Sequence, residues 1–336
     1  MSFNITGITN IEKPIEFLFN INNNNPNSPE FKEFLHYKHE YLKFRMNMPL
    51  DMKVEYSLNR IRAFYKYYNG DVYVAFSGGK DSVVLLDLVR SVYPGVVAIF
   101  CDTGVEFPET RDFVRGCNKV EIIRPSVMFK DVLRDYGYPV VSKEQSSYIR
   151  EVRKYGKNSK IGKMRLTGKD YNGKTYGAIY KKWQFLIDAP FKVSEECCYK
   201  LKKEPFYKLG SERGIFPFIG LTSGESRSRR GQWIKFGCNI YGENGAGRPL
   251  MFWREDDVLE YVRRRGLRLS KVYDMGYRRT GCIYCMFGLH LESQKEGINR
   301  FERLKVTHRK LWEYAIGESG LGLGKIMDYC KFSYGR

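Results

Sequence analysis

The chain has 336 residues and carries 57 Lys and Arg against 38 Asp and Glu, a formal net charge of +19 at pH 7. This length is enough for about two domains, each able to bury a core without disulfide bonds. No apolar run approaches the ~20 residues of a membrane-spanning helix, and the N-terminus lacks the charged start and apolar stretch of a signal peptide, so we expect a cytoplasmic protein that makes no membrane contact.

The first 70 residues predict a helical N-terminal region. Asn, Pro and Ser cluster in NINNNNPNSPE (20–30), a composition that favours a loop or linker. Apolar and aromatic side chains then recur at helical spacing over residues 30–44 and 54–70, with Gly70 near the end of the second helix.

From residue 71 onward, strand and helix patterns alternate. This alternation predicts βαβ units, and hence an α/β fold with an open, mostly parallel twisted sheet and helices on both faces. The helical N-terminal region precedes this sheet, and a mainly helical, cysteine-bearing part follows it. The predicted strands are 72–76, 95–102 and 119–125, and the predicted helices are 81–93, 108–117 and 128–136.

Residues 143–190 form a predicted basic insertion. Between Lys143 and Lys182, twelve Lys and Arg stand against three Asp and Glu, a net charge of +9. Alternation in KMRLTGKDYNGKTYGAIY (163–180), with YNGK at its centre, predicts a β-hairpin. The insertion is either a solvated surface ribbon or an arm that binds a polyanion, with DNA or RNA as the candidate partner.

The remaining chain returns to one strand and then to helices. GIFPFIGLTSGES (214–226) has strand-then-loop character, and helices are predicted over 254–267 and 299–316. A second basic cluster falls at the end of the first of these helices. Its members, which are also candidates for contact with nucleic acid, are Arg263, Arg264, Arg265 and Arg268.

SGGKDS links the first strand of the alternation to its first helix. A glycine-rich turn in this position presents backbone N–H groups at the helix N-terminus, and these donors and the helix dipole favour a phosphate. The glycines permit positive φ, the serines can donate hydroxyl hydrogen bonds, the lysine can neutralise a phosphate, and the aspartate can order the loop or bind Mg2+. The candidate phosphate-binding residues are Ser77, Gly78, Gly79, Lys80, Asp81 and Ser82.

The spacing of SGGKDS differs from the P-loop pattern GxxxxGK[ST] and from the dinucleotide pattern GxGxxG. In its strand–loop–helix setting it resembles the signature of the PP-loop ATP pyrophosphatase superfamily, in which this loop grips pyrophosphate. The resemblance extends to FCDTGVEFPET (100–110), at the carboxyl end of the next strand, where open α/β sheets bind ligands. It implies that a nucleotide or metal site is also lined by Asp102, Thr103, Gly104 and Glu106.

The eight cysteines are unevenly spaced, which is typical of a metal site more than of a disulfide framework. Cys197 and Cys198 are adjacent, and Cys282 and Cys285 are separated by two residues, a spacing that lets two thiolates converge on one metal centre. The lysines of YKLKK (199–203) would offset the thiolate charge. The partnerless thiols, expected to be core or surface residues, are Cys101, Cys117 and Cys330.

The tandem cysteines, the LKKEP that follows and the distant CxxC together resemble the PAPS reductase family, over roughly residues 71–330. The adenylyl-sulfate reductase branch carries a [4Fe-4S] cluster on a tandem pair and a CxxC pair, which implies four cluster ligands here: Cys197, Cys198, Cys282 and Cys285. The DNA-phosphorothioation enzyme of the family resembles this chain around CYKLK only through the first cysteine, so Cys238 is an alternative fourth ligand to Cys198. A structural Zn2+ is the alternative to the cluster.

Two further segments support the same resemblance. GLTSGESRSRR is similar to the substrate loop of the family, which implies anion contacts by Glu225, Ser226, Arg227 and Arg230. GCIYCMFGLHLE and NRFERLKVTH are similar to a bacterial and phage subgroup that is named after the reductases.

The sequence also departs from the family. Sulfonucleotide reductases end in a Glu-Cys-Gly-containing tail with a redox cysteine, whereas this chain ends MDYCKFSYGR. PAPS reductases lack the lysine in the loop, and SGGKDS with Lys80 instead resembles enzymes that split ATP into AMP and pyrophosphate. The resemblance therefore implies an enzyme that binds ATP and Mg2+, adenylates an acceptor and acts in sulfur transfer or nucleic-acid modification, with Lys80, Asp81 and Asp102 as catalytic residues and a sulfur-donor protein as a candidate partner.

Two other functions stay open at this point: sulfonucleotide reduction with Cys330 as an atypical nucleophile, and a non-catalytic, nucleotide-gated module that binds nucleic acid or regulates. The predicted domain plan is a helical region with a linker (1–70), a PP-loop nucleotide-binding domain with the basic insertion (71–235) and a C-terminal helical region with the CxxC loop (236–336).

Overall fold

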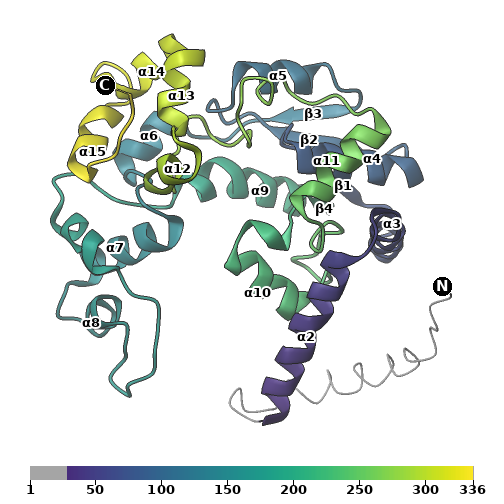
Figure 1. The fold of residues 1–336 in the computed structure, drawn as a ribbon, viewed down its shortest axis with the longest axis horizontal. Coiled ribbons are helices and arrows are strands. Elements are labelled where there is room, and N and C mark those ends of the chain that lie inside the picture. Colours follow the sequence, from purple (N-terminus) through teal and green to yellow (C-terminus); the bar gives the residue numbers. More distant parts are fainter. Residues whose placement is uncertain (1–28, 336) are drawn as a thin grey trace.

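A six-stranded sheet is the framework of the computed structural model, which describes residues 29–335 (Figure 1). Its strand order is β3-β2-β1-β4-β6-β5, and every neighbouring pair is parallel except β5 with β6. The predicted α/β fold with an open, mostly parallel sheet is therefore confirmed. The strands are β1 (Val72–Ala75), β2 (Ala98–Cys101), β3 (Val120–Ile123), β4 (Phe216–Ile219), β5 (Asn239–Ile240) and β6 (Ala246–Gly247).

Helices precede, connect and follow these strands, as the sequence predicts. The helices are α2 (Pro29–Asn47), α3 (Leu50–Tyr67), α4 (Lys80–Val92), α5 (Pro108–Arg115), α6 (Phe129–Asp135), α7 (Lys143–Tyr155), α8 (Lys160–Thr167), α9 (Glu204–Arg213), α10 (Arg227–Phe236), α11 (Glu255–Arg265), α12 (Leu289–Glu296), α13 (Arg300–Thr307), α14 (Arg309–Ile316) and α15 (Leu323–Cys330), with 3-10 turns η1 (Lys181–Asp188) and η3 (Ser223–Glu225) and a π turn η2 (Tyr199–Lys203). The Asn-rich stretch before residue 29 lies outside the described residues. No helix within the described range combines the length and apolarity that a membrane crossing requires.

The two faces of the sheet are covered by different helices. Successive side chains of a strand point to opposite faces. In β1, Val74 joins an apolar cluster with Phe64 of α3 and Val258 of α11, while Tyr73 packs with Leu209 of α9 on the other face. This sandwich holds the carboxyl ends of β1, β2 and β4 at one edge, where the loops of interest begin.

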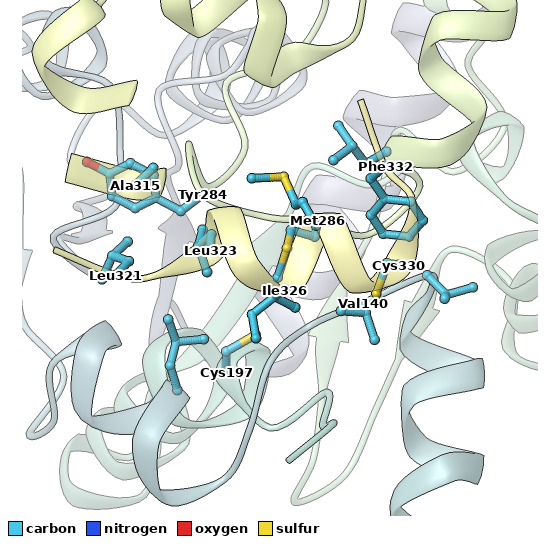
Figure 2. Packing of buried hydrophobic residues seen from close by; sticks show 14 of the residues in the cluster. Val140, Cys197, Tyr284, Met286, Ala315, Leu321, Leu323, Ile326, Cys330 and Phe332 are labelled. Atoms are coloured by element: carbon cyan, nitrogen blue, oxygen red, sulfur yellow. The ribbon is translucent and has the colours of Figure 1, made fainter. Parts of the chain in front are cut away.

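A second apolar cluster joins residues 129–201 to the C-terminal helices. Figure 2 shows Cys197, Met286, Ile326 and Cys330 in this cluster, and all four side chains are buried. Because these residues come from α15, the CxxC loop and the tandem-cysteine segment, the cluster holds the two cysteine pairs of the sequence in one region.

The prediction of a β-hairpin at residues 163–180 is wrong. Ser142 and Ser159 cap the N-termini of α7 and α8 by accepting hydrogen bonds from backbone N–H groups, and Gly168 ends α8 with φ +76°. These capping signals make residues 160–167 helical, so the first part of the predicted hairpin does not form. Only one antiparallel bridge, Lys169 with Thr175, remains around the predicted turn.

The sheet itself extends beyond residue 235, because β5 and β6 pair at its edge. These strands lie in the region that the sequence assigns to the C-terminal helices. The division at 235/236 stays a prediction.

Candidate functional site

The SGGKDS loop forms a tight turn between β1 and α4. Gly78 has φ +70°, and a Cβ placed on it would lie 2.9 Å from Cγ2 of Thr110, so glycine meets both a conformational and a steric demand. The Ser77 N–H donates to Oγ of Ser82 (3.2 Å), whose hydroxyl donates to the Gly79 carbonyl (2.8 Å). The serines therefore hold the shape of the loop.

Lys80 opens α4 with a side chain that is only 8 % exposed. Its Nζ lies 3.0 Å from Oε1 of Glu255 and donates to the Arg278 carbonyl at 3.1 Å. The Lys80 N–H donates to the Tyr273 hydroxyl at 2.8 Å. The ammonium is thus already paired with a carboxylate, and an incoming phosphate would take the position of Glu255.

Positive charge gathers beside Asp81. Burial raises the pKa of Asp81, whereas Lys80 and Arg279 oppose this rise. Burial lowers the pKa of Arg229, and nearby Arg279 lowers it further, while Asp81 opposes this. Arg229 also pairs with Glu225. An anion bound here would relieve the repulsion between these two guanidinium groups.

The loop after β2 is a rigid, carboxylate-bearing turn. Asp102 accepts from Nη2 of Arg111 (2.6 Å) and from the Gly104 N–H (3.2 Å). The Thr103 hydroxyl donates to Oε1 of Glu106 at 2.7 Å. Both carboxylates are buried, and because β1 and β2 are parallel neighbours, this turn lies at the same sheet edge as SGGKDS.

The loop after β4 leads into α10. Ser226 caps this helix by accepting from the Arg229 N–H (3.2 Å), and Glu225 lies in the preceding 3-10 turn. The predicted Arg227 and Arg230 are exposed, whereas Arg229, which the sequence reasoning missed, is 32 % exposed and lies near Asp81. The Ser226 cap was the available signal, because it sets the helical register. No local signal identified Arg279, which comes from a distant loop.

The four predicted cluster cysteines lie in one region. The thiols of Cys197 and Cys198 are hydrogen-bonded, Cys282 and Cys285 act electrostatically on Cys197, and Lys202 contacts Cys282. Burial raises the pKa of Cys285 to about 11. Among the side chains that the structure describes, however, no three from His, Cys, Asp or Glu stand close enough together to hold a metal ion.

The tandem cysteines differ in environment. The hydrogen bond from Cys197 lowers the pKa of Cys198 to about 6, with further help from Lys143 and Lys202, whereas that bond and burial raise the pKa of Cys197. Cys197 is buried in the apolar cluster, but Cys198 faces a cavity of about 420 Å3. The cavity is lined by Lys143, Glu195, Glu196, Cys198, Tyr199 and Lys203.

The donor set fits an iron–sulfur cluster in chemistry. The four thiols supply the ligand type that such a group needs. Its negative charge would be balanced by three nearby cations, Lys143, Lys202 and Arg300. The structure does not bring Cys238 to them. That thiol is buried in the other apolar cluster, near Trp233.

Two contacts connect the β2 loop to the cysteine region. The Ile283 N–H, inside the CxxC loop, donates to the Val105 carbonyl at 2.8 Å. Lys202 contacts Cys282 and places its Nζ 3.8 Å from Glu106. The β2 loop and the CxxC loop are therefore in direct contact, and the Lys202 side chain lies between Glu106 and Cys282.

Of the remaining cysteines, Cys101 lies beside this contact, because its thiol donates to the Leu201 carbonyl at 3.3 Å and Glu106 and Lys202 act on it electrostatically. Cys101 is in β2, and Cys117 lies beyond the end of α5. Cys330 is 3 % exposed in α15, and burial raises its pKa to about 12.

Comparison with known proteins adds a family to this geometry. The model of the phosphoadenosine phosphosulfate (PAPS) reductase domain matches residues 71–176 and 141–287, which together exceed half of the chain. The chain belongs to the PAPS reductase family. The matched ranges contain the SGGKDS loop, the β2 loop, the β4 loop and all four candidate cluster cysteines.

Curated proteins resemble the chain at low identity. An uncharacterized protein of Methanocaldococcus jannaschii, MJ0066, is 26 % identical over 264 residues, which cover 75 % of this chain and 42 % of that protein. The chain therefore spans less than half the length of that relative. An adenosine 5'-phosphosulfate reductase of Staphylococcus epidermidis is 24 % identical over 230 residues, or 66 % of this chain and 72 % of the reductase.

Solved structures show weak overall similarity. PAPS reductase from Candida auris aligns with a TM-score of 0.41 and 16 % identity, covering 69 % of this chain and 93 % of that one. The U34-tRNA thiolase NcsA of Methanococcus maripaludis, solved with its [4Fe-4S] cluster, aligns with a TM-score of 0.37 and 15 % identity, covering 78 % and 80 %.

Proposed function

We propose that this PAPS reductase family member binds ATP and Mg2+ at the carboxyl edge of its sheet and adenylates an acceptor, releasing pyrophosphate. The acceptor belongs to sulfur transfer or nucleic-acid modification. The observation that carries the proposal is the position of Lys80, a buried ammonium at the start of α4 that is held by the exchangeable carboxylate of Glu255.

In the proposed reaction, an oxygen or nitrogen of the acceptor attacks the α-phosphorus of ATP. The bond from that phosphorus to the bridging oxygen breaks, and pyrophosphate leaves with the bonding electrons. Lys80 and the N–H groups of SGGKDS stabilise the charge that develops on pyrophosphate. Asp81 and Asp102 are oxygen donors of the kind that Mg2+ prefers, and Arg229 and Arg279 screen the remaining phosphate charge.

The cysteines form the second part of the proposed site. Cys197, Cys198, Cys282 and Cys285 would hold a [4Fe-4S] cluster, with a structural Zn2+ as the alternative. When bound, the cluster would supply or relay sulfur to the activated acceptor. Lys202 would neutralise thiolate charge and, through its approach to Glu106, keep the cysteine region against the nucleotide loops.

Sulfonucleotide reduction is the second candidate, and the similarity to the Staphylococcus reductase favours it. Reduction with Cys330 as nucleophile would require that thiol to reach the substrate, although it is 3 % exposed. Cys330→Ser separates the two functions, since it would abolish reduction and leave pyrophosphate release intact.

The direct test is pyrophosphate release by the anaerobically purified protein. ATP and Mg2+ are supplied with bulk RNA or heat-denatured DNA as acceptor, and pyrophosphate is assayed. Lys80→Ala should lower the rate by about 100-fold or more, since it removes a group that stabilises the leaving charge. Lys208→Ala removes an exposed lysine on α9 and should change nothing. Absence of pyrophosphate with every acceptor, or full activity in Lys80→Ala, would disprove the proposal.

A further inference from the structure

The segment 143–182, which we call the basic lobe, comprises α7, α8, the loop after α8 and the start of η1. Figure 1 shows α8 and its following loop at the outer end of the molecule, on the other side of α7 from the sheet. Its net charge of +9 is about half of the +19 of the whole chain. How the lobe uses that charge depends on which of its cations already have partners.

Four cations of the lobe serve the fold. Arg150 pairs with Glu195 (2.5 Å), Lys157 with Asp188 (2.8 Å) and Arg165 with Glu151 (2.6 Å). Arg153 donates to four backbone carbonyls between residues 186 and 191. Three of these four groups are arginines, and their pairing holds α7 and α8 against the adjoining chain.

Eight other lysines are exposed, and no carboxylate of the described residues lies within ion-pair distance of any of them. Four of these, Lys160, Lys163, Lys169 and Lys174, lie on α8 and the loop that follows it. Unpaired, solvated ammonium groups release counterions when they contact phosphates, so they favour a polyanion.

Exposed tyrosines accompany these lysines. Tyr171 is 83 % exposed and Tyr180 is 65 % exposed, and neither ring belongs to a core cluster. Lys160 Nζ lies 5.6 Å from the ring centroid of Tyr171, and Lys174 Nζ lies 5.6 Å from that of Tyr176. Exposed aromatic rings interleaved with ammonium groups are the combination that stacks bases while neutralising phosphates.

This combination selects among polyanions. A duplex keeps its base faces stacked inside the helix, so its phosphates would contact the lysines but its bases would not stack on the tyrosine rings. An acidic peptide has no flat π-face to offer the tyrosines. A single strand offers both phosphates and unstacked bases.

The lobe also connects with the proposed site. Lys143, the first residue of α7, lines the 420 Å3 cavity that Cys198 faces, together with Tyr199. α7 runs from Lys143 at this cavity to Tyr155, shortly before α8 begins, so this helix connects the cavity with the α8 end of the lobe.

We propose that the basic lobe binds single-stranded nucleic acid and presents it to the cavity beside Cys198. This deepens the proposed function, on which it rests for the identity of the acceptor. Lys160, Lys163 and Lys174 contact phosphates, and Tyr171 and Tyr180 stack on bases.

The binding test uses fluorescein-labelled oligo(dT) and oligo(U) of about 20 nucleotides, and a duplex of equal length, with anisotropy as the readout. The variant K160A/K163A/K174A should weaken single-strand binding by about tenfold or more, whereas R263A/R264A/R265A, which removes the same charge from α11, should change it by less than about twofold. Equal losses in the two variants would overturn the proposal, as would duplex binding as tight as that of the single strand. Tighter oligo(U) or oligo(dT) binding distinguishes an RNA from a DNA source.

The tyrosines are tested separately, because they distinguish stacking from charge alone. Tyr171→Ala should weaken binding by about fivefold or more, and Tyr171→Phe should retain it. Photo-crosslinking of an oligonucleotide that carries 5-iodouracil should label peptides within 155–180. Crosslinks confined to other peptides would overturn the assignment.

Binding is measured without ATP, so it is independent of the proposed reaction. If pyrophosphate is never released but the lobe variants still lose binding, the adenylation proposal fails and the lobe assignment stands. If pyrophosphate is released but K160A/K163A/K174A binds and reacts normally, the lobe assignment fails alone. Circular dichroism of each variant checks that the loss is not one of folding.

Discussion

The basic lobe and the arginine run of α11 (Arg263–Arg265) are both rich in positive charge, but their surroundings differ. In α11, Arg263 lies 2.8 Å from Glu260, Arg264 lies 3.0 Å from Asp51, and Arg265 lies 3.1 Å from Asp87. Apart from Lys157, the exposed lysines of the lobe have no carboxylate within ion-pair distance among the side chains that the structure describes. The arginine run is therefore largely neutralised within the protein, and the lobe is not.

The cysteines also differ in their surroundings. Cys282 lies with the tandem pair and Lys202, whereas Cys238 is buried near Trp233 in the cluster on the sheet. Residues of one type thus differ in what they can bind according to their neighbours in space. The contrast can be tested by removing or exchanging those neighbours.

The largest expected effect concerns the cysteines. Cys282→Ala should abolish the absorption near about 400 nm of the anaerobically purified protein, because it removes a cluster ligand, whereas Cys238→Ala should keep it. Ultraviolet–visible spectra and iron content measure the outcome. Loss of absorption in Cys238→Ala alone would reverse the assignment, and a colourless, zinc-loaded protein would replace iron–sulfur by zinc.

Charge reversal in the lobe should have the next largest effect. The variant K160E/K163E/K174E replaces three ammonium groups of the lobe by carboxylates. It should weaken oligo(dT) binding by about 100-fold at low salt. Anisotropy titrations at several salt concentrations measure this, and the slope against salt should also flatten. A loss below about tenfold would mean that other cations carry the binding.

Removing an acidic partner from α11 should have a smaller effect in the opposite direction. Glu260→Gln frees the guanidinium of Arg263 and removes one of the two carboxylates beside Arg264, and it should raise oligo(dT) affinity by about two- to threefold at low salt. Glu313→Gln removes the same charge beside the single Arg309 and should have a smaller effect. Equal gains would mean that only the net charge matters.

The smallest expected effect is one of pH. Hydrogen bonds from Arg263 and Arg264 lower the pKa of Glu260 to about 2. A depressed carboxyl pKa means that the pairing is complete above the ordinary value of 4.5 and is lost only as the pH falls toward 2. A carbon NMR titration of the Glu260 carboxyl should show no change between pH 8 and pH 5. A midpoint above 4.5 would contradict the neutralisation of the arginine run.

Much of the fold could be predicted from local patterns. β-Branched runs followed by polar loops identified β1 and β2, and the SGGKDS turn was placed correctly between β1 and α4. The lobe was mispredicted, because alternation in residues 163–180 outweighed the caps at Ser159 and Gly168. A helix cap depends on a single residue, so a pattern read over many residues easily overlooks it.

The candidate site was predicted in part. The loop residues and the four cysteines were named from the sequence and the family resemblance, and their catalytic and ligand roles stay predictions. Arg229 was missed because the sequence analysis named its neighbour Arg230 instead. No local sequence pattern pointed to Arg279. The pairing of Lys80 with Glu255 joins residues 175 positions apart, so no spacing rule could find it.

By itself, the sequence determined the α/β framework, the loop chemistry at the ends of β1 and β2, and the excess of positive charge. These features depend on the order of neighbouring residues, through side-chain alternation, glycine conformation and composition. Only the tertiary structure decided which cations stay unpaired, which cysteines meet and which arginines approach Asp81. Those outcomes depend on distances of a few ångströms between segments that are far apart in the chain, and Coulomb and hydrogen-bond energies are set by such distances.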